Sequence, residues 1–146
     1  MSPNSRHEFY KENIGMLLEA YLFEVGIRFY SLGSTTWRDS NLQKGIEADK
    51  SYCFGSKKNI PDLAIEVVIT SGGVDTLTVY QGLGVPEVWF LVHSRLRVYS
   101  WQNGEYVQVE KSELLPKLDL DLLASYVEWD EPFDAVLEFR KKIISA

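Results

Sequence analysis

Two short apolar runs predict the centre of a β-sheet. Residues 63–69 and 85–92 are rich in β-branched and aromatic side chains, as is typical of strands buried on both faces. Residues 74–83 lie between them, have helical spacing and end before Gly84. This order of strand, helix and strand predicts a crossover unit in which the two strands are parallel neighbours.

The N-terminal segment predicts a helix that packs across this sheet. Ser5 and Glu8, three residues apart, form a capping-box pattern that is typical of a helix start. Apolar residues recur at helical spacing from Tyr10 to Val25, and Gly26 is a typical helix stop. The apolar face of this helix is expected to point toward the core.

Further strands and helices are predicted on both sides of the crossover unit. Asn103-Gly104 is a typical two-residue hairpin turn, flanked by alternating segments. The remaining predicted strands are Ile27–Leu32, Ser34–Trp37 and Asp49–Phe54, and the remaining predicted helices are Asp121–Val127 and Glu131–Ile144. The sequence therefore predicts an α/β fold with a mixed β-sheet flanked by helices, in a single domain spanning residues 1–146.

Composition and charge narrow the classes of function. The single Cys53 excludes an internal disulfide framework and a cysteine-based zinc site, and it fits a reducing cytoplasm. No apolar run is long enough to span a membrane and no leader pattern opens the chain, so we expect a cytoplasmic protein without a membrane partner. The formal net charge of −6 argues against a large basic surface for nucleic acid.

An acidic residue interrupts the first of the two apolar runs. A buried carboxylate such as that of Glu66 costs several kcal/mol, as an order of magnitude, unless it is paired or binds a cation. Asp49 precedes it, and two carboxylates converging near a sheet suit a hard cation such as Mg²⁺. An alternative is a structural ion pair between Glu66 and Arg28, Arg95 or Arg97.

Other polar residues have simpler interpretations. Asp62 follows a proline at a strand start, where aspartate is common as a turn residue. His7 and His93 are too isolated to indicate a zinc site. We expect His7 to be exposed near a helix start and His93 to be a turn residue.

Several segments together resemble one family of nucleases. They are Arg6-His7-Glu8, Gly45-Ile46-Glu47-Ala48-Asp49, Pro61-Asp62-Leu63-Ala64-Ile65-Glu66-Val67-Val68, Thr70-Ser71-Gly72-Gly73, Tyr80, Gly84-Val85-Pro86-Glu87-Val88-Trp89, Leu114-Leu115-Pro116 and Leu118-Asp119-Leu120. With these segments the chain resembles the Uma-type family of the PD-(D/E)XK nuclease superfamily, over nearly the whole domain.

The resemblance implies a restriction-endonuclease-like fold with a metal site at one end of a mixed sheet. It implies that Asp49 and Glu66 are the paired metal-binding acids, with Glu8 as a further acid from the first helix. The implied reaction is hydrolysis of phosphodiester bonds in DNA with Mg²⁺, or with Mn²⁺ in its place. The superfamily's lysine position, two residues after Glu66, holds Val68, and the Uma-type position for this lysine holds Thr76.

The missing lysine leaves two hypotheses open. Thr76 takes the catalytic position and can hydrogen-bond a water, but it carries no charge, and Lys50, Lys57 and Lys58 are candidate substitutes from nearby loops. The first hypothesis is a magnesium-dependent DNA endonuclease. The second is a nuclease-fold protein without catalysis that serves as a binding or assembly module.

A homodimer is expected under the first hypothesis. Restriction-type nucleases often pair so that two sites address two strands, and two-fold dimers are the commonest oligomers. The aromatic hairpin with Tyr99, Trp101 and Tyr106 is a candidate contact surface. The alternative is that these rings pack within their own domain.

Overall fold

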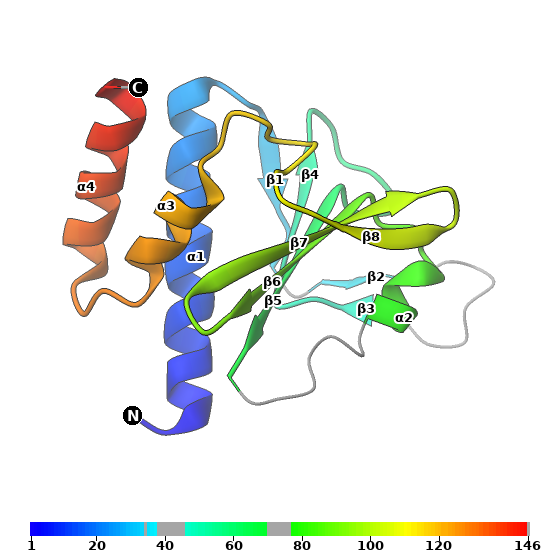
Figure 1. Cartoon of the computed structure of the whole chain (residues 1–146), viewed down its shortest axis with the longest axis horizontal. Coiled ribbons are helices and arrows are strands. Elements are labelled where there is room, and N and C mark those ends of the chain that lie inside the picture. Colours follow the sequence, from blue (N-terminus) through cyan, green and yellow to red (C-terminus); the bar gives the residue numbers. More distant parts are fainter. Residues whose placement is uncertain (34, 38–45, 70–76, 146) are drawn as a thin grey trace.

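The computed structural model describes residues 1–33, 35–37, 46–69 and 77–145 (Figure 1). Its elements are α1 (Pro3–Val25), β1 (Phe29–Ser31), β2 (Thr36–Trp37), β3 (Ile46–Glu47), β4 (Lys50–Phe54), β5 (Leu63–Val68), α2 (Leu77–Gln81), β6 (Glu87–Val92), β7 (Arg95–Gln102), β8 (Glu105–Val109), α3 (Leu120–Val127) and α4 (Pro132–Ser145). None of the helices among these described residues is long and apolar enough to cross a membrane.

A six-stranded mixed sheet forms the centre of the fold. Its strand order is β1-β4-β5-β6-β7-β8, and β2 pairs with β3 in a separate two-stranded sheet. The helices α1, α3 and α4 lie together on one side of the large sheet, and α2 lies at the other side near β2 and β3 (Figure 1). This arrangement confirms the predicted α/β fold with a mixed sheet flanked by helices.

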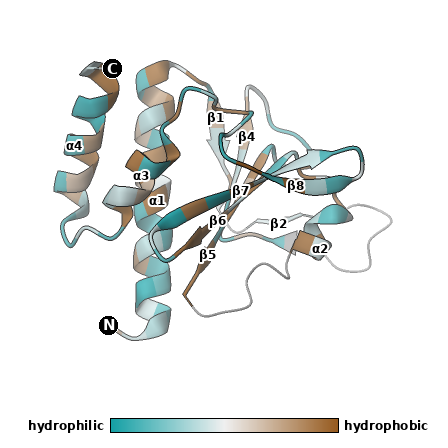
Figure 2. Ribbon diagram, viewed as in Figure 1, coloured by the Kyte–Doolittle hydropathy of each residue, from teal (hydrophilic) through white to brown (hydrophobic). Residues whose placement is uncertain are grey.

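The two apolar runs form the parallel pair that the sequence predicts. β5 and β6 are parallel neighbours, with Leu63 opposite Glu87 and Val68 opposite Val92. Apolar residues are concentrated in these two strands (Figure 2). Alternate residues of β5 point to opposite faces, so Leu63, Ile65 and Val67 join the core under α1, α3 and α4. The intervening Glu66 therefore belongs to the face that carries α2.

The first helix begins earlier than the capping-box pattern predicts. Ser2, not Ser5, is the N-cap, because its side chain accepts a hydrogen bond from the Ser5 backbone N–H. Pro3 then occupies the first turn, where its missing N–H costs nothing. Gly26 ends the helix as predicted, in the left-handed conformation with φ 75°.

The hairpin is also confirmed, and its rings pack inside the domain. Asn103 and Gly104 both have positive φ angles, as the tight turn between β7 and β8 requires. The Trp101 and Tyr106 rings lie 4.8 Å apart, and the Tyr99 ring lies 5.6 Å from that of Phe90. These contacts favour the alternative in which the hairpin aromatics stabilise their own domain.

A buried carboxyl group fixes the segment after the hairpin to the sheet. Glu87, at the start of β6, is 1% exposed. Its Oε2 accepts hydrogen bonds from Trp89 Nε1 and the Ser112 hydroxyl, and its Oε1 accepts one from the Glu113 backbone N–H at 2.9 Å. Four donors, including the Leu114 N–H, thus converge on one side chain, which holds the chain between β8 and α3 in place.

Replacing Glu87 by glutamine should destabilise the fold. Either orientation of the amide turns its NH₂ group toward two of the present donors, and of these only the Ser112 hydroxyl can act as an acceptor instead, so at least one buried hydrogen bond is lost. We expect the free energy of unfolding to fall by about 2–3 kcal/mol in urea titrations. The matched Glu105→Gln change, on exposed β8, should stay within about 0.5 kcal/mol of the unmodified chain. An equal effect of the two substitutions would contradict this role for Glu87.

Candidate active site

Two acidic residues face each other across neighbouring strands. In the antiparallel pair of β4 and β5, Lys50 lies opposite Ile65 and Ser51 opposite Ala64. Continuing this register by one residue places Asp49 opposite Glu66. The structure therefore brings together the two acids that the sequence predicts as a pair, on neighbouring strands at one end of the sheet.

Glu66 is a partly buried acid with an unusual ionisation. Burial raises its pKa to about 7, and the adjacent Asp49 adds to the increase, against the effect of a hydrogen bond from the Tyr80 hydroxyl to Oε1. The same burial and the nearby carboxylates raise the pKa of Tyr80. Tyr80 comes from α2, so the helix after β5 folds back to donate to the acid on that strand.

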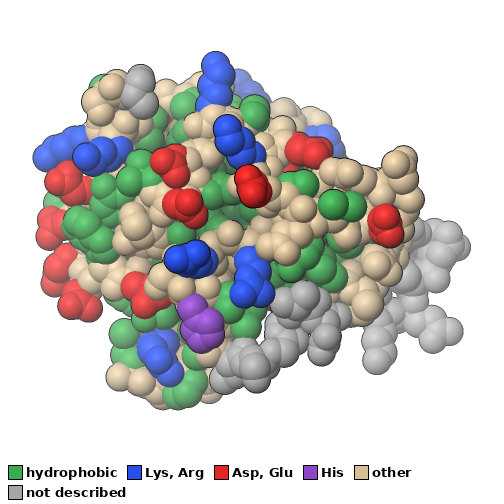
Figure 3. Space-filling view, in the orientation of Figure 1, with side chains coloured by type: hydrophobic (Ala, Val, Ile, Leu, Met, Phe, Trp, Pro, Cys, Tyr) green, Lys and Arg blue, Asp and Glu red, His purple; other side chains and the backbone are tan. Residues whose placement is uncertain are grey.

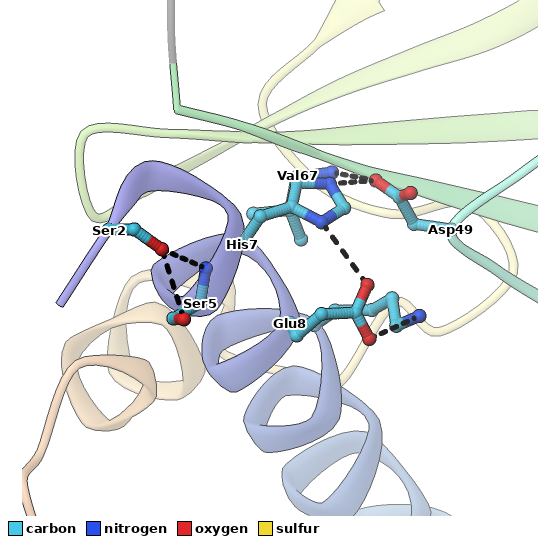
Figure 4. A network of polar contacts seen from close by, with 7 residues as sticks. Ser2, Ser5, His7, Glu8, Asp49 and Val67 are labelled. Atoms are coloured by element: carbon cyan, nitrogen blue, oxygen red, sulfur yellow. Dashed lines mark hydrogen bonds and ion pairs between the residues drawn. The ribbon is translucent and has the colours of Figure 1, made fainter.

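Asp49 is oriented from the other side by two donors. Its Oδ2 lies 2.8 Å from the Val67 backbone nitrogen and 3.0 Å from His7 Nε2 (Figure 4). The Val67 N–H belongs to β5, and His7 comes from the first turns of α1. The carboxyl group of Asp49 thus links the N-terminal turns of α1 to one end of the β4–β5 pair.

His7 stands between Asp49 and the third predicted acid. Its Nδ1 lies 3.7 Å from Glu8 Oε1, on the side of the ring away from Asp49 (Figure 4). Glu8 is exposed and pairs with Lys11 at 2.9 Å, which lowers the pKa of Glu8 and raises that of Lys11. Glu8 therefore reaches the acid pair through the imidazole of His7, not by direct contact.

One face of α1 packs along β4. His7, Lys11, Gly15 and Glu19 are four residues apart and so share a face of the helix. Glu19 accepts a hydrogen bond from the Tyr52 hydroxyl at 2.8 Å, and Lys50 lies against Gly15. A Cβ atom at position 15 would be only 2.7 Å from Lys50 Cε, so the absence of a side chain there makes room for the lysine.

The other candidate lysines lie near the opposite end of β5. Lys58 bonds Asp62 at 2.7 Å, and Lys57 lies 5.7 Å from the centre of the Tyr30 ring. Asp62 also accepts the Phe54 N–H at 2.7 Å, so it is a turn residue that orders the loop between β4 and β5. Four residues of strand, about 13 Å, separate Asp62 from Glu66.

The position that corresponds to the family's lysine lies outside the described residues. Thr76 precedes the first described residue of α2, and the predicted helix over 74–83 is described only as Leu77–Gln81. Lys50 is therefore the one predicted substitute that lies beside the pair, although its side chain follows α1.

Sequence reasoning missed two residues of the site. His7 was expected to be exposed, yet its side chain is only 28% exposed and bonds Asp49. Tyr80 had no predicted role at the acids. Both belong to segments that carry the family resemblance, which is the one signal that could have identified them. In the described part of the chain, Glu66 forms no ion pair with any of the three arginines considered.

The donor set suits a cation that keeps much of its water. Among the described residues, no three His, Cys, Asp or Glu side chains form a metal-binding group. Mg²⁺ is commonly held by one or two carboxylates and completes its shell with water and substrate phosphate. Two facing carboxyl groups, one of them partly buried with a raised pKa, meet that requirement.

The acid pair should make stability depend on pH in the absence of divalent ions. Between the ordinary pKa of 4.5 and the folded value of about 7, the folded protein keeps a proton on Glu66 that the unfolded chain has released. The free energy of unfolding therefore falls as the pH rises through this window, by about 3 kcal/mol. Urea titrations in a chelator should show this fall in the unmodified chain and in the Glu110→Gln control, but not in Glu66→Gln. The same fall in Glu66→Gln would contradict the assignment.

The chain was also compared with known proteins. A family model, Uma2, described as "Putative restriction endonuclease", matches residues 1–130. The matched range includes Asp49, Glu66, His7 and Tyr80 and ends just before α4. No curated protein matches the chain.

Proposed function

Starting from the membership of this chain in the Uma2 family, we propose that it hydrolyses phosphodiester bonds in DNA with a divalent cation held by Asp49 and Glu66. One observation carries the proposal. Two carboxyl groups converge at a sheet end, and one has its pKa raised to about 7, with no cationic side chain among the described residues paired to it. A bound cation would balance the negative charge of two carboxylates this close together.

The cation would supply the chemistry that the side chains lack. Bound magnesium polarises a phosphoryl oxygen and lowers the pKa of a coordinated water. Manganese prefers similar oxygen ligands and is the expected substitute.

The residues of the chain have positioning roles in this proposal. His7 and the Val67 N–H fix one oxygen of Asp49, so its carboxyl group cannot turn away from Glu66. The Tyr80 hydroxyl donates to Oε1 of Glu66, so Oε2 is the oxygen that would bind the cation. Glu8 holds Lys11 and faces His7, so it acts through the imidazole.

The missing lysine limits the rate that we expect. Developing negative charge on the phosphate is normally stabilised by a positive group near the metal. Lys57 contacts the Tyr30 ring and Lys58 pairs with Asp62, which lies four strand residues from Glu66. Lys50 packs along α1 against Gly15. We therefore propose weak cleavage by the unmodified chain. A nuclease-fold module without catalysis is the competing function, favoured by the uncharged Thr76 and by the net charge of −6.

Divalent ions should stabilise the protein through the acid pair. At pH 8 and ten times the dissociation constant of the ion, linkage predicts a gain of about 1.4 kcal/mol in the free energy of unfolding. Thermal unfolding with Mg²⁺ or Mn²⁺ should show this gain for the unmodified chain and for Glu110→Gln, but not for Asp49→Asn or Glu66→Gln. Calorimetry measures the same binding directly. A gain that persists in Glu66→Gln would exclude this site.

Restoring a positive charge at position 76 should increase cleavage of DNA. One preorganised electrostatic donor is worth roughly 10²–10³ in rate in other enzymes. We expect Thr76→Lys to cut supercoiled plasmid faster than the unmodified chain with either ion, and Thr76→Met to serve as an uncharged control of similar length.

Three outcomes of the plasmid assay separate the hypotheses. Cleavage that disappears in Glu66→Ala supports the nuclease. Strong cleavage that survives Glu66→Ala refutes the site. Absence of cleavage by both the unmodified chain and Thr76→Lys, with ion binding intact, favours the inactive module.

A further inference from the structure

The outer side of α1 and α4 exposes large apolar side chains. Phe23 on α1 and Phe133 on α4 are each 74% exposed, and Met16, Leu137 and Ile144 are exposed as well. Met16, Phe23, Phe133 and Leu137 line a groove of about 620 Å³ between the two helices. Contiguous exposed apolar side chains of this kind are typical of interaction surfaces.

The fourth helix is apolar on two sides. Ala135 and Phe139 are buried against the rest of the domain. Phe133, Leu137, Arg140 and Ile144 follow one another at spacings of four, three and four residues on the outer side. This is the spacing of a coiled-coil seam, in which one helix packs lengthwise on another. Arg140 within the stripe is held to Glu24 of α1 at 2.8 Å, which leaves the apolar positions open.

The charges beside this stripe identify the partner. Figure 3 shows acidic side chains along the lower part of the edge formed by α4 and basic side chains above them. Asp134 and Lys141 are both exposed and lie seven residues, about two turns, apart on the same flank of the stripe. An antiparallel copy of α4, related by a two-fold axis near Leu137, places Asp134 opposite the partner's Lys141 and the reverse. In a parallel copy the same flanks would point away from each other, so this attraction would be absent.

We propose that the protein forms a two-fold homodimer in which α4 of each copy packs antiparallel on the outer α1–α4 face of the other. The contact is self-complementary, as closed two-fold dimers require. It places four helices side by side, with Leu137 of each copy near the axis. The strands β4 and β5, which carry the acid pair at one end, lie on the other side of α1 from α4 (Figure 1). The dimer can therefore be tested separately from the proposed nuclease activity, and failure of one proposal does not imply failure of the other.

The oligomeric state of the full chain tests this contact. Sedimentation velocity from about 1 to 200 µM should show a monomer–dimer equilibrium. Leu137→Asp should raise the dissociation constant at least about 100-fold, because it buries a charge at the centre of the interface. Val107→Asp on β8 is the matched control, since Val107 is 37% exposed and Leu137 is 39% exposed. Circular dichroism should show that both variants remain folded.

A charge exchange tests the antiparallel arrangement. Asp134→Lys should weaken the dimer about tenfold, because two symmetry-related attractions become repulsions. Adding Lys141→Asp should restore the dissociation constant to within about threefold of the original. A chain that is monomeric throughout the concentration range would overturn the proposal. So would a dimer that Val107→Asp abolishes and Leu137→Asp does not, or a double variant as weak as Asp134→Lys alone.

Discussion

The register between β4 and β5 places two carboxyl groups opposite each other. Several surrounding residues donate hydrogen bonds that offset the resulting repulsion. Like charges directly opposite on antiparallel strands are unfavourable. The fold offsets the cost with one donor from each side: α2 supplies the Tyr80 hydroxyl to Glu66, and α1 supplies His7 to Asp49. Two helices on opposite faces of the sheet are thus positioned by contacts with the same pair of acids. A change in their ionisation should be felt by both helices.

The elements that were predicted well are those defined by local patterns. The apolar runs of β5 and β6, the Asn103-Gly104 turn and the Gly26 helix stop each depend on a few neighbouring residues. Glu66 was found for the same reason, because an acid within an apolar run is visible in the sequence itself. The N-cap was misplaced because Ser2 and Ser5 both precede a helical pattern, and only the backbone geometry separates them.

The rest of the site depends on contacts that no local pattern contains. His7 and Asp49 are separated by 42 positions, and their contact follows from how α1 lies across the sheet. Tyr80 has the pattern of a core residue in a short helix, and it is indeed buried; its hydroxyl meets Glu66 only because the crossover brings α2 back over β5. The role of Thr76 remains a prediction, since it lies outside the described residues.

The glycine in the middle of α1 links two positions far apart in the chain. Glycine costs about 1 kcal/mol relative to alanine inside a helix. Here it makes room for Lys50, whose Cε would lie 2.7 Å from an added Cβ. An alanine at position 15 would have to displace only the far end of the flexible Lys50 side chain, which can move at little cost. The glycine thus determines where the Lys50 ammonium group lies: with a side chain at position 15, that charge would leave the groove between α1 and β4 and move beside it.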